Sequence, residues 1–300
     1  MGEPVIQLNK VTKKISGKTI VNNLTLQINR GEVFGLLGPN GAGKTTTIRM
    51  MVGLISISAG DILINGWSIS KHFQEAISRV GAVVENPEFY QFLSGYQNLT
   101  HYVNLHPQVS RERINKVSTM VGLSARINDP VRTYSLGMRQ RLGLAQALLH
   151  CPSVLILDEP TNGLDPTGIR ELRQYLRRLA EEEGVAVVVS SHLLSEMDLI
   201  CDRVAFIKGG RLLDVKQVGN SSEKRWVSFE VDHPERAGME IQRIVPGVNL
   251  KYTGGMVEVL ADREKTAVLT EALIIAGVKV YGIISKEKSL EDLFMEVTKE

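Results

Sequence analysis

A glycine-rich segment near the N-terminus has the composition and spacing of a phosphate-binding loop. It reads Gly38-Pro39-Asn40-Gly41-Ala42-Gly43-Lys44-Thr45-Thr46, which contains the pattern GxxxxGK[ST] between a strand-like stretch at 32–37 and a helical pattern. Glycines let backbone N–H groups close around phosphate oxygens, and the N-terminus of the following helix adds partial positive charge. Lys44 is therefore expected to contact the β- and γ-phosphates of a nucleotide, Thr45 to bind Mg²⁺, and Thr46 to donate a further hydrogen bond. The alternative is a glycine-rich turn that only caps a helix.

Two carboxylates follow the apolar run 154–157, which has the character of a buried strand. Acids at the end of such a strand are costly unless they are paired or bound to a cation. Asp158 is placed to hold Mg²⁺, and Glu159 is placed to polarise an attacking water as general base. The alternative is a solvated strand end. Together with the loop at 38–46, the two acids predict an enzyme that hydrolyses ATP with Mg²⁺.

Three further segments resemble the motifs of ABC proteins. Residues 134–141, Tyr-Ser-Leu-Gly-Met-Arg-Gln-Arg, resemble the ABC signature, usually Leu-Ser-Gly-Gly-Gln followed by basic residues. Gly163-Leu164-Asp165 resembles the D-loop, and His192, after the apolar run 185–189, resembles the switch histidine. The ordered set extends over about Val5 to Val215, and by it the chain is identified as a member of the ABC ATP-binding subunits.

The resemblance implies a dimer in which ATP lies between the phosphate loop of one copy and the signature of the other. Ser135 and Gly137 would then contact the γ-phosphate across the interface, with Asp165 beside the nucleotide. It also implies that Lys44, Glu159 and His192 form the catalytic group. Ser135 could instead be a plain helix N-cap, and a single histidine is more often structural.

The chain departs from the ABC pattern at three places. Ile15 stands where the family has an aromatic residue that stacks on adenine, and Glu85 replaces the glutamine expected after the strand at 79–84. Glu85 would favour the metal through its extra negative charge; the alternative is a surface acid. The signature has Leu136 and Met138 in place of a glycine and a glutamine. The segment 85–90 resembles ATPases of the bacitracin and lantibiotic export group, and so does the segment 289–294.

Composition excludes several other functions. The net charge of the 300 residues is only +2, and no basic run is long enough to bind nucleic acid. Apolar stretches such as 185–189 are far shorter than the roughly 20 residues that span a bilayer, so any membrane path must belong to another chain. Cys151 and Cys201 show no disulfide or zinc spacing and are expected to be small buried side chains.

Alternating strand and helix patterns predict an α/β domain with a largely parallel sheet at 1–217, which for an ABC protein includes a helical subdomain. After the polar stretch 218–224 the pattern restarts as β-α-β-β-α-β with a terminal helix at 290–297. This order is typical of a small ferredoxin-like α+β domain, here 218–300.

The predicted function is the ATP-hydrolysing subunit of a bacterial ABC transporter. The resemblance favours export of a peptide antibiotic, drug or similar amphipathic compound through a separate permease, with 85–99 as the permease-facing loop. A homodimer, or pairing with another ATPase subunit, is expected, in the cytoplasm on the inner face of the membrane. The alternatives are a soluble ABC ATPase without a transport role and an importer ATPase.

Overall fold

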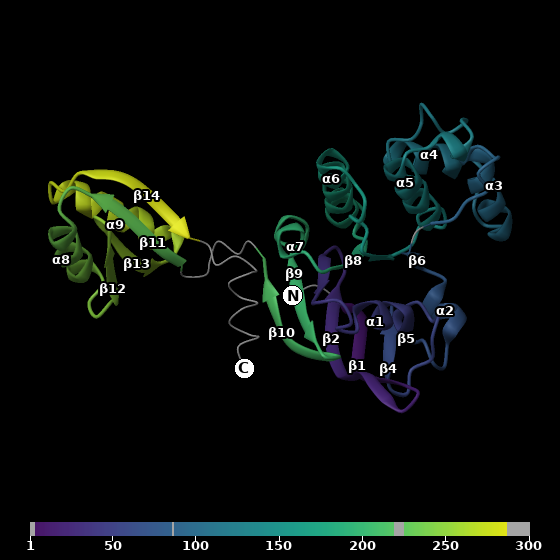
Figure 1. Ribbon diagram of the computed structural model, residues 1–300, viewed down its shortest axis with the longest axis horizontal. Helices are drawn as coiled ribbons and strands as arrows, with labels where there is room; N and C mark the ends of the chain where they lie inside the picture. The colour runs from purple at the N-terminus through teal and green to yellow at the C-terminus, as the bar shows by residue number, and fades with distance from the viewer. Residues whose placement is uncertain (1–3, 86, 219–224, 287–300) are drawn as a thin grey trace. The chain divides into compact units, whose positions relative to one another are not determined.

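The computed structural model describes residues 4–85, 87–218 and 225–286, and the chain divides into two compact units, Met1–Val218 and Gly219–Glu300. In Figure 1, the first unit extends from the purple N-terminal strands to the green strand β10. Its elements are β1 (Pro4–Ile15), β2 (Lys18–Asn29), β3 (Val33–Leu37), α1 (Lys44–Met51), β4 (Ala59–Ile64), β5 (Trp67–Ser68), α2 (Phe73–Ile77), β6 (Val80–Val83), α3 (Gly95–Leu105), α4 (Glu112–Met120), η1 (Val131–Thr133), α5 (Leu136–Ala147), β7 (Val154–Asp158), α6 (Pro166–Glu183), β8 (Ala186–Ser191), α7 (Leu194–Ile200), β9 (Arg203–Lys208) and β10 (Arg211–Gln217).

The larger sheet of this unit aligns the strands that carry the predicted site. Its strand order is β10-β9-β3-β8-β7-β6, and all neighbours are parallel except β10 and β9. Leu37 at the end of β3 pairs with Ser191 of β8, and Asp158 at the end of β7 pairs with Ser190. The loops that follow these strands therefore leave the sheet at one edge, where α/β proteins bind their ligands.

A second, antiparallel sheet contains strands that the sequence pattern did not separate from the first. Its order is β2-β1-β4-β5, and β1 pairs with both β2 and β4. The prediction of a largely parallel sheet is thus correct only for the other sheet. The alternation of buried and exposed residues along β2 is typical of an antiparallel strand with one face on the core.

Helices α3, α4 and α5 lie together in Figure 1 and form the helical part of the unit, between β6 and β7 along the chain. Helix α3 begins with a capping box: the Ser94 hydroxyl accepts from the N–H of Gln97, whose side chain accepts from the N–H of Ser94. The hydroxyl of Tyr134, the first residue of the signature segment, donates to the carbonyl of Arg126 at 2.7 Å. Burial raises the pKa of Tyr134, so its hydroxyl stays protonated as a donor.

The second unit has the predicted element order. It consists of β11 (Arg225–Val231), α8 (Pro234–Ile244), β12 (Leu250–Thr253), β13 (Met256–Ala261), α9 (Arg263–Ile275) and β14 (Val280–Lys286). The antiparallel sheet has the order β12-β13-β11-β14, that of a ferredoxin-like fold. Val227 and Phe229 of β11 pack with Ile241 of α8 and Leu269 of α9 in its core. The helix predicted at 290–297 lies outside the described residues.

Two further expectations concern membrane spans and the cysteines. In the described part of the chain, no helix is long and apolar enough to cross a membrane. Cys201 is buried, but Cys151 is exposed, so that half of the cysteine prediction was wrong. Cys151 occupies a left-handed turn (φ 54°) between α5 and β7, where the chain reverses direction at the surface.

Candidate active site

The predicted phosphate-binding loop connects β3 to α1 and depends on its glycines. Gly41 and Gly43 have φ values of 78° and 105°, which L side chains rarely adopt. A Cβ on Gly38 would clash with the carbonyl oxygen of Ile207 in β9. Helix α1 begins at Lys44 with no side chain capping it, so its first N–H groups point toward whatever anion the loop encloses. This donor set fits the phosphates of a nucleotide.

Lys44 is almost fully enclosed, with 5% of its surface exposed. Its Nζ donates to the carbonyl oxygen of Gly38 at 2.7 Å and lies 3.4 Å from Oε1 of Glu159. A buried ammonium is costly unless it is paired, and the carbonyl and the carboxylate supply that compensation. The structure therefore joins the loop and the second acid, which are 115 positions apart in sequence numbering (159 − 44).

The two carboxylates at the end of β7 are ordered by a buried serine that sequence reasoning missed. Ser190 of β8 donates its hydroxyl to Oδ1 of Asp158 at 2.5 Å and accepts the backbone N–H of Glu159 at 2.9 Å. One hydroxyl thus fixes the direction of Asp158 and the backbone at Glu159. The signal in the sequence was a pair of serines directly after the apolar run 185–189.

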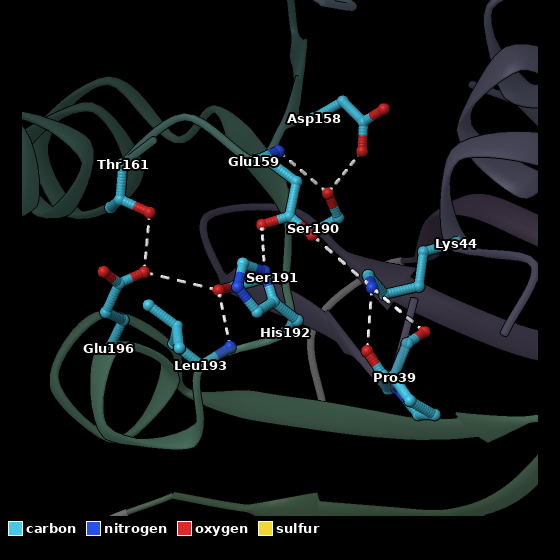
Figure 2. Close-up of polar contacts among 11 residues, drawn as sticks. Pro39, Lys44, Asp158, Glu159, Thr161, Ser190, Ser191, His192, Leu193 and Glu196 are labelled. Atoms are coloured by element: carbon cyan, nitrogen blue, oxygen red, sulfur yellow. Dashed lines mark hydrogen bonds and ion pairs between the residues drawn. The ribbon is translucent and has the colours of Figure 1, made fainter. Parts of the chain in front are cut away.

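Glu159 lies between the loop lysine and the predicted switch histidine, as Figure 2 shows. Its Oε2 is 2.9 Å from Nδ1 of His192, while Oε1 faces Lys44. The backbone of Glu159 is left-handed, with φ 48°. The structure thus brings together the three residues predicted as catalytic, Lys44, Glu159 and His192.

A second link joins the same two loops beside this group. The Thr161 hydroxyl donates to Oε2 of Glu196 on α7 at 2.6 Å, and the Ser191 hydroxyl donates to the same oxygen at 3.3 Å. Ser191 also accepts the N–H of Leu193 at 3.0 Å. Sequence reasoning missed Glu196 and Thr161, because a carboxylate near a helix start and a threonine in a loop carry no distinctive pattern.

The signature segment lies against the D-loop of the same chain. Ser135 caps α5 by accepting the N–H of Met138 at 3.2 Å, and Asp165 caps α6 by accepting the N–H of Gly168 at 2.8 Å. A Cβ on Gly163 would clash with the side chain of Leu136, the residue that departs from the family pattern. These segments border a cavity of about 690 Å³ between α5 and α6.

The structure does not join the signature to the lysine–glutamate–histidine group. Within the described part of this single chain, neither Ser135 nor Asp165 is hydrogen-bonded to Lys44, Glu159 or His192.

Glu85 and Ile15, the two departures near the nucleotide loop, are both exposed. Glu85 has φ 72° and forms an ion pair with Arg49 of α1; 65% of its side chain is exposed. Ile15 ends β1 opposite Lys18 and is 47% exposed. No group of three or more His, Cys, Asp or Glu in the described residues is arranged to hold a metal ion.

The chain is similar to known proteins along most of its length. Residues 21–162 match the protein family described as ABC transporter. The chain is 52% identical over 298 residues to YhcH of Bacillus subtilis, an uncharacterized ABC transporter ATP-binding protein, covering 99% of this chain and 96% of that protein. It is 35% identical over 296 residues to the bacitracin transport ATP-binding protein BcrA of Bacillus licheniformis, covering 98% and 97%.

A solved structure shares the fold of the first unit. The ATP-binding cassette MJ0796, described as a dimer in a post-hydrolysis state bound to ADP and Pi, matches with a TM-score of 0.64 and 24% identity, over 71% of this chain and 98% of that one. Since relatives at 35–52% identity extend over nearly the whole chain, the protein belongs to the family of ABC transporter ATP-binding subunits and is an ABC-type ATPase.

Proposed function

We propose that Lys44, Glu159 and His192 are the catalytic group of one half of an ATP site. The observation that carries this proposal is the placement of Glu159 between the Lys44 ammonium and the His192 ring, at 3.4 and 2.9 Å. Lys44 would stabilise negative charge on the β- and γ-phosphates. Glu159 would accept a proton from the attacking water, and His192 would orient that water or the γ-phosphate.

The nucleotide and metal would be held by residues around this group. The loop 38–46 would enclose the phosphates with its N–H groups, and Thr45 and Asp158 would hold Mg²⁺. Mg²⁺, when bound, would neutralise charge between the β- and γ-phosphate oxygens. Ser190 supports this role because its hydrogen bond to Asp158 fixes the carboxylate before a metal arrives.

We further propose that Ser135, Gly137 and Asp165 act on ATP bound to a second copy of the chain. Two observations support a head-to-tail homodimer: among the described residues, Ser135 and Asp165 cap their own helices and are not hydrogen-bonded to the lysine–glutamate–histidine group, and MJ0796, which shares the fold, is described as a dimer. Because one chain supplies both halves, both sites of such a dimer would be competent. Residues 1–217 would form this ATPase domain and 218–300 an accessory domain.

The chain would power export of a peptide antibiotic, drug or similar amphipathic compound through a separate permease, on the cytoplasmic face of the membrane. The similarity to the bacitracin transport protein BcrA along almost the whole chain supports this substrate class. The segment after Glu85 offers a contact for the permease: Tyr90 and Phe92 have ring centroids 5.9 Å apart, and Phe92 is 74% exposed. Exposed aromatic side chains of this kind are enriched where proteins meet partners.

Reconstitution tests both parts of the proposal. The chain would be copurified with its membrane partner and placed in lipid vesicles. ATP hydrolysis would then be measured with bacitracin, a lantibiotic or buffer. We expect hydrolysis that one of the peptides stimulates, and none in a Lys44→Ala control. Hydrolysis that responds to none of the export substrates, with unchanged drug sensitivity in cells lacking the chain, would rule out the export proposal but leave the ATPase assignment.

A further inference from the structure

Two connections join the loop that carries Glu159 to the loop that carries His192. The loops follow β7 and β8, which are neighbouring parallel strands with Asp158 opposite Ser190. The first connection is the 2.9 Å contact between Glu159 and His192. The second is the hydrogen bond from Thr161 to Glu196, two residues after Glu159 and four after His192. Figure 2 shows the two connections side by side.

The hydrogen bond between Thr161 and Glu196 is strong, and its donor is buried. Its length is 2.6 Å, the Thr161 residue is only 4% exposed, and the acceptor is a carboxylate oxygen. Hydrogen bonds to an ionised acceptor are shorter and about twice as strong as neutral ones. If Glu196 were removed, the Thr161 hydroxyl would be left buried without this acceptor, which is more costly than losing an exposed bond.

Both ends of this bond are anchored in the segments that must be positioned. The Thr161 carbonyl accepts the N–H of Leu164 at 3.1 Å, so Thr161 is the first residue of the turn that leads to Asp165. Glu196 lies in α7. Its carboxylate also accepts a hydrogen bond from Ser191, the residue directly before His192. A shift of Glu196 would therefore move both the D-loop and the end of β8.

We propose that Glu196 is a positioning residue for ATP hydrolysis, which holds the Glu159 loop and the His192 loop at a fixed separation through Thr161 and Ser191. This inference rests on the proposed roles of Glu159 and His192. Lys44 and His192 would give up their contacts with Glu159 when a γ-phosphate and a water enter. The Thr161–Glu196 bond involves none of these three side chains, so it remains to keep the loops aligned.

The test uses two pairs of variants in the full-length chain with its permease. Glu196→Ala removes the acceptor and Thr161→Val removes the donor with little change in shape; each is expected to lower kcat about 10- to 100-fold, as misplacement of reacting groups by about 1 Å does. The KM for ATP should stay within about threefold, because the phosphate loop is untouched. Glu196→Gln and Thr161→Ser keep an acceptor and a donor and should retain most of the activity. Glu182→Ala, at an exposed glutamate of α6, is the matched control and should behave as the wild type.

A double-mutant cycle separates positioning from general damage. If the bond itself matters, Glu196→Ala combined with Thr161→Val should be no slower than the slower single variant. The inference is wrong if Glu196→Ala hydrolyses ATP at the wild-type rate, if Glu196→Gln is as impaired as Glu196→Ala, or if kcat, KM and the melting temperature all deteriorate together. These outcomes leave the ATPase assignment intact, because that assignment fails only if the wild-type chain itself does not hydrolyse ATP.

Discussion

Glu159 is the residue on which the proposed chemistry converges. Its two carboxylate oxygens face Lys44 and His192, and its N–H is held by Ser190. A non-glycine residue at φ 48° carries strain of order 1–3 kcal/mol, and such strain is found mainly at functional sites. The backbone there is held by the Ser190 hydroxyl, which aims the carboxylate toward the phosphate loop.

Replacing this residue tests its role as base. Glu159→Gln keeps the shape but cannot accept a proton, so steady-state hydrolysis should fall about 10²- to 10⁴-fold, the usual contribution of a positioned base. ATP binding should survive, and a dimer with trapped ATP should be visible by size-exclusion chromatography. Lys44→Ala is the contrasting variant and should lose binding as well. Near-normal turnover in Glu159→Gln would show that another group is the base.

Glu85 has a partner that the sequence did not indicate, the Arg49 guanidinium on the helix that begins at Lys44. Both side chains are largely exposed, so the pair itself adds little stability. We expect Glu85→Ala to leave nucleotide affinity within a few-fold but to lower hydrolysis linked to the permease. Arg49→Ala, which frees Glu85, should not reproduce that loss. An unchanged rate for Glu85→Ala in the assembled transporter would make Glu85 a surface acid.

Because of Ile15, the site is expected to select only weakly between adenine and guanine nucleotides. Stacking on an aromatic ring contributes about 1–3 kcal/mol per base in nucleic-acid complexes, and isoleucine has no such ring. GTP should therefore compete with ATP within roughly tenfold, and Ile15→Tyr should tighten ATP binding by about one to two powers of ten. Titration of both proteins with both nucleotides decides this. A wild type that strongly prefers ATP, with no gain in the variant, would remove Ile15 from the adenine contact.

At the scale of elements, the turn between α5 and β7 contains a pH-sensitive contact. His150 lies 3.1 Å from the carbonyl of Val80 in β6 and stacks on His106, with ring centroids 5.3 Å apart. Burial lowers the pKa of His150, the carbonyl of Val80 acts against this, and His106 and Arg113 lower it further. The half-buried ring therefore favours its neutral form.

This shift makes part of the stability depend on pH. Below the unfolded pKa of about 6.5 the unfolded chain binds a proton that the folded chain resists. The contribution of His150 is thus fully present above pH 6.5 and is lost as the pH falls through the folded pKa. We expect the melting temperature of His150→Gln to fall less than that of the wild type between pH 7 and 5, while the two run parallel from pH 7.5 to 8.5. Parallel curves throughout would contradict the lowered pKa.

At the scale of the whole molecule, the proposed dimer predicts complementation between two inactive chains. Ser135→Arg would disable the signature and Lys44→Ala the phosphate loop, so a mixed dimer should contain one working site and recover up to about half of the activity per dimer. Because Ser135 also caps α5, the loss of the cap could cost about 1 kcal/mol. Ser135→Asp, which can still cap, is the control for that effect. Mixed dimers shown to form by cross-tagging but still inactive would exclude the head-to-tail arrangement.

Local patterns along the sequence were enough for the motifs and for most elements. The loop 38–46, the acids 158 and 159, the helix cap at Ser135 and the order of the C-terminal elements all depend on neighbours within a few positions, where spacing determines geometry.

Contacts between distant segments were decided only by the tertiary structure. One of these is the division of the strands into two sheets. The Arg49–Glu85 pair and the hydrogen bonds from Ser190 to Asp158 and from Thr161 to Glu196 join positions 32 to 36 residues apart. Ordinary serines, threonines and glutamates have no periodic signature, so their roles arise only when parallel strands bring their ends to one edge. The sequence by itself identified the residues proposed to meet the nucleotide; the packing of β7 against β8 decided which residues hold them in place.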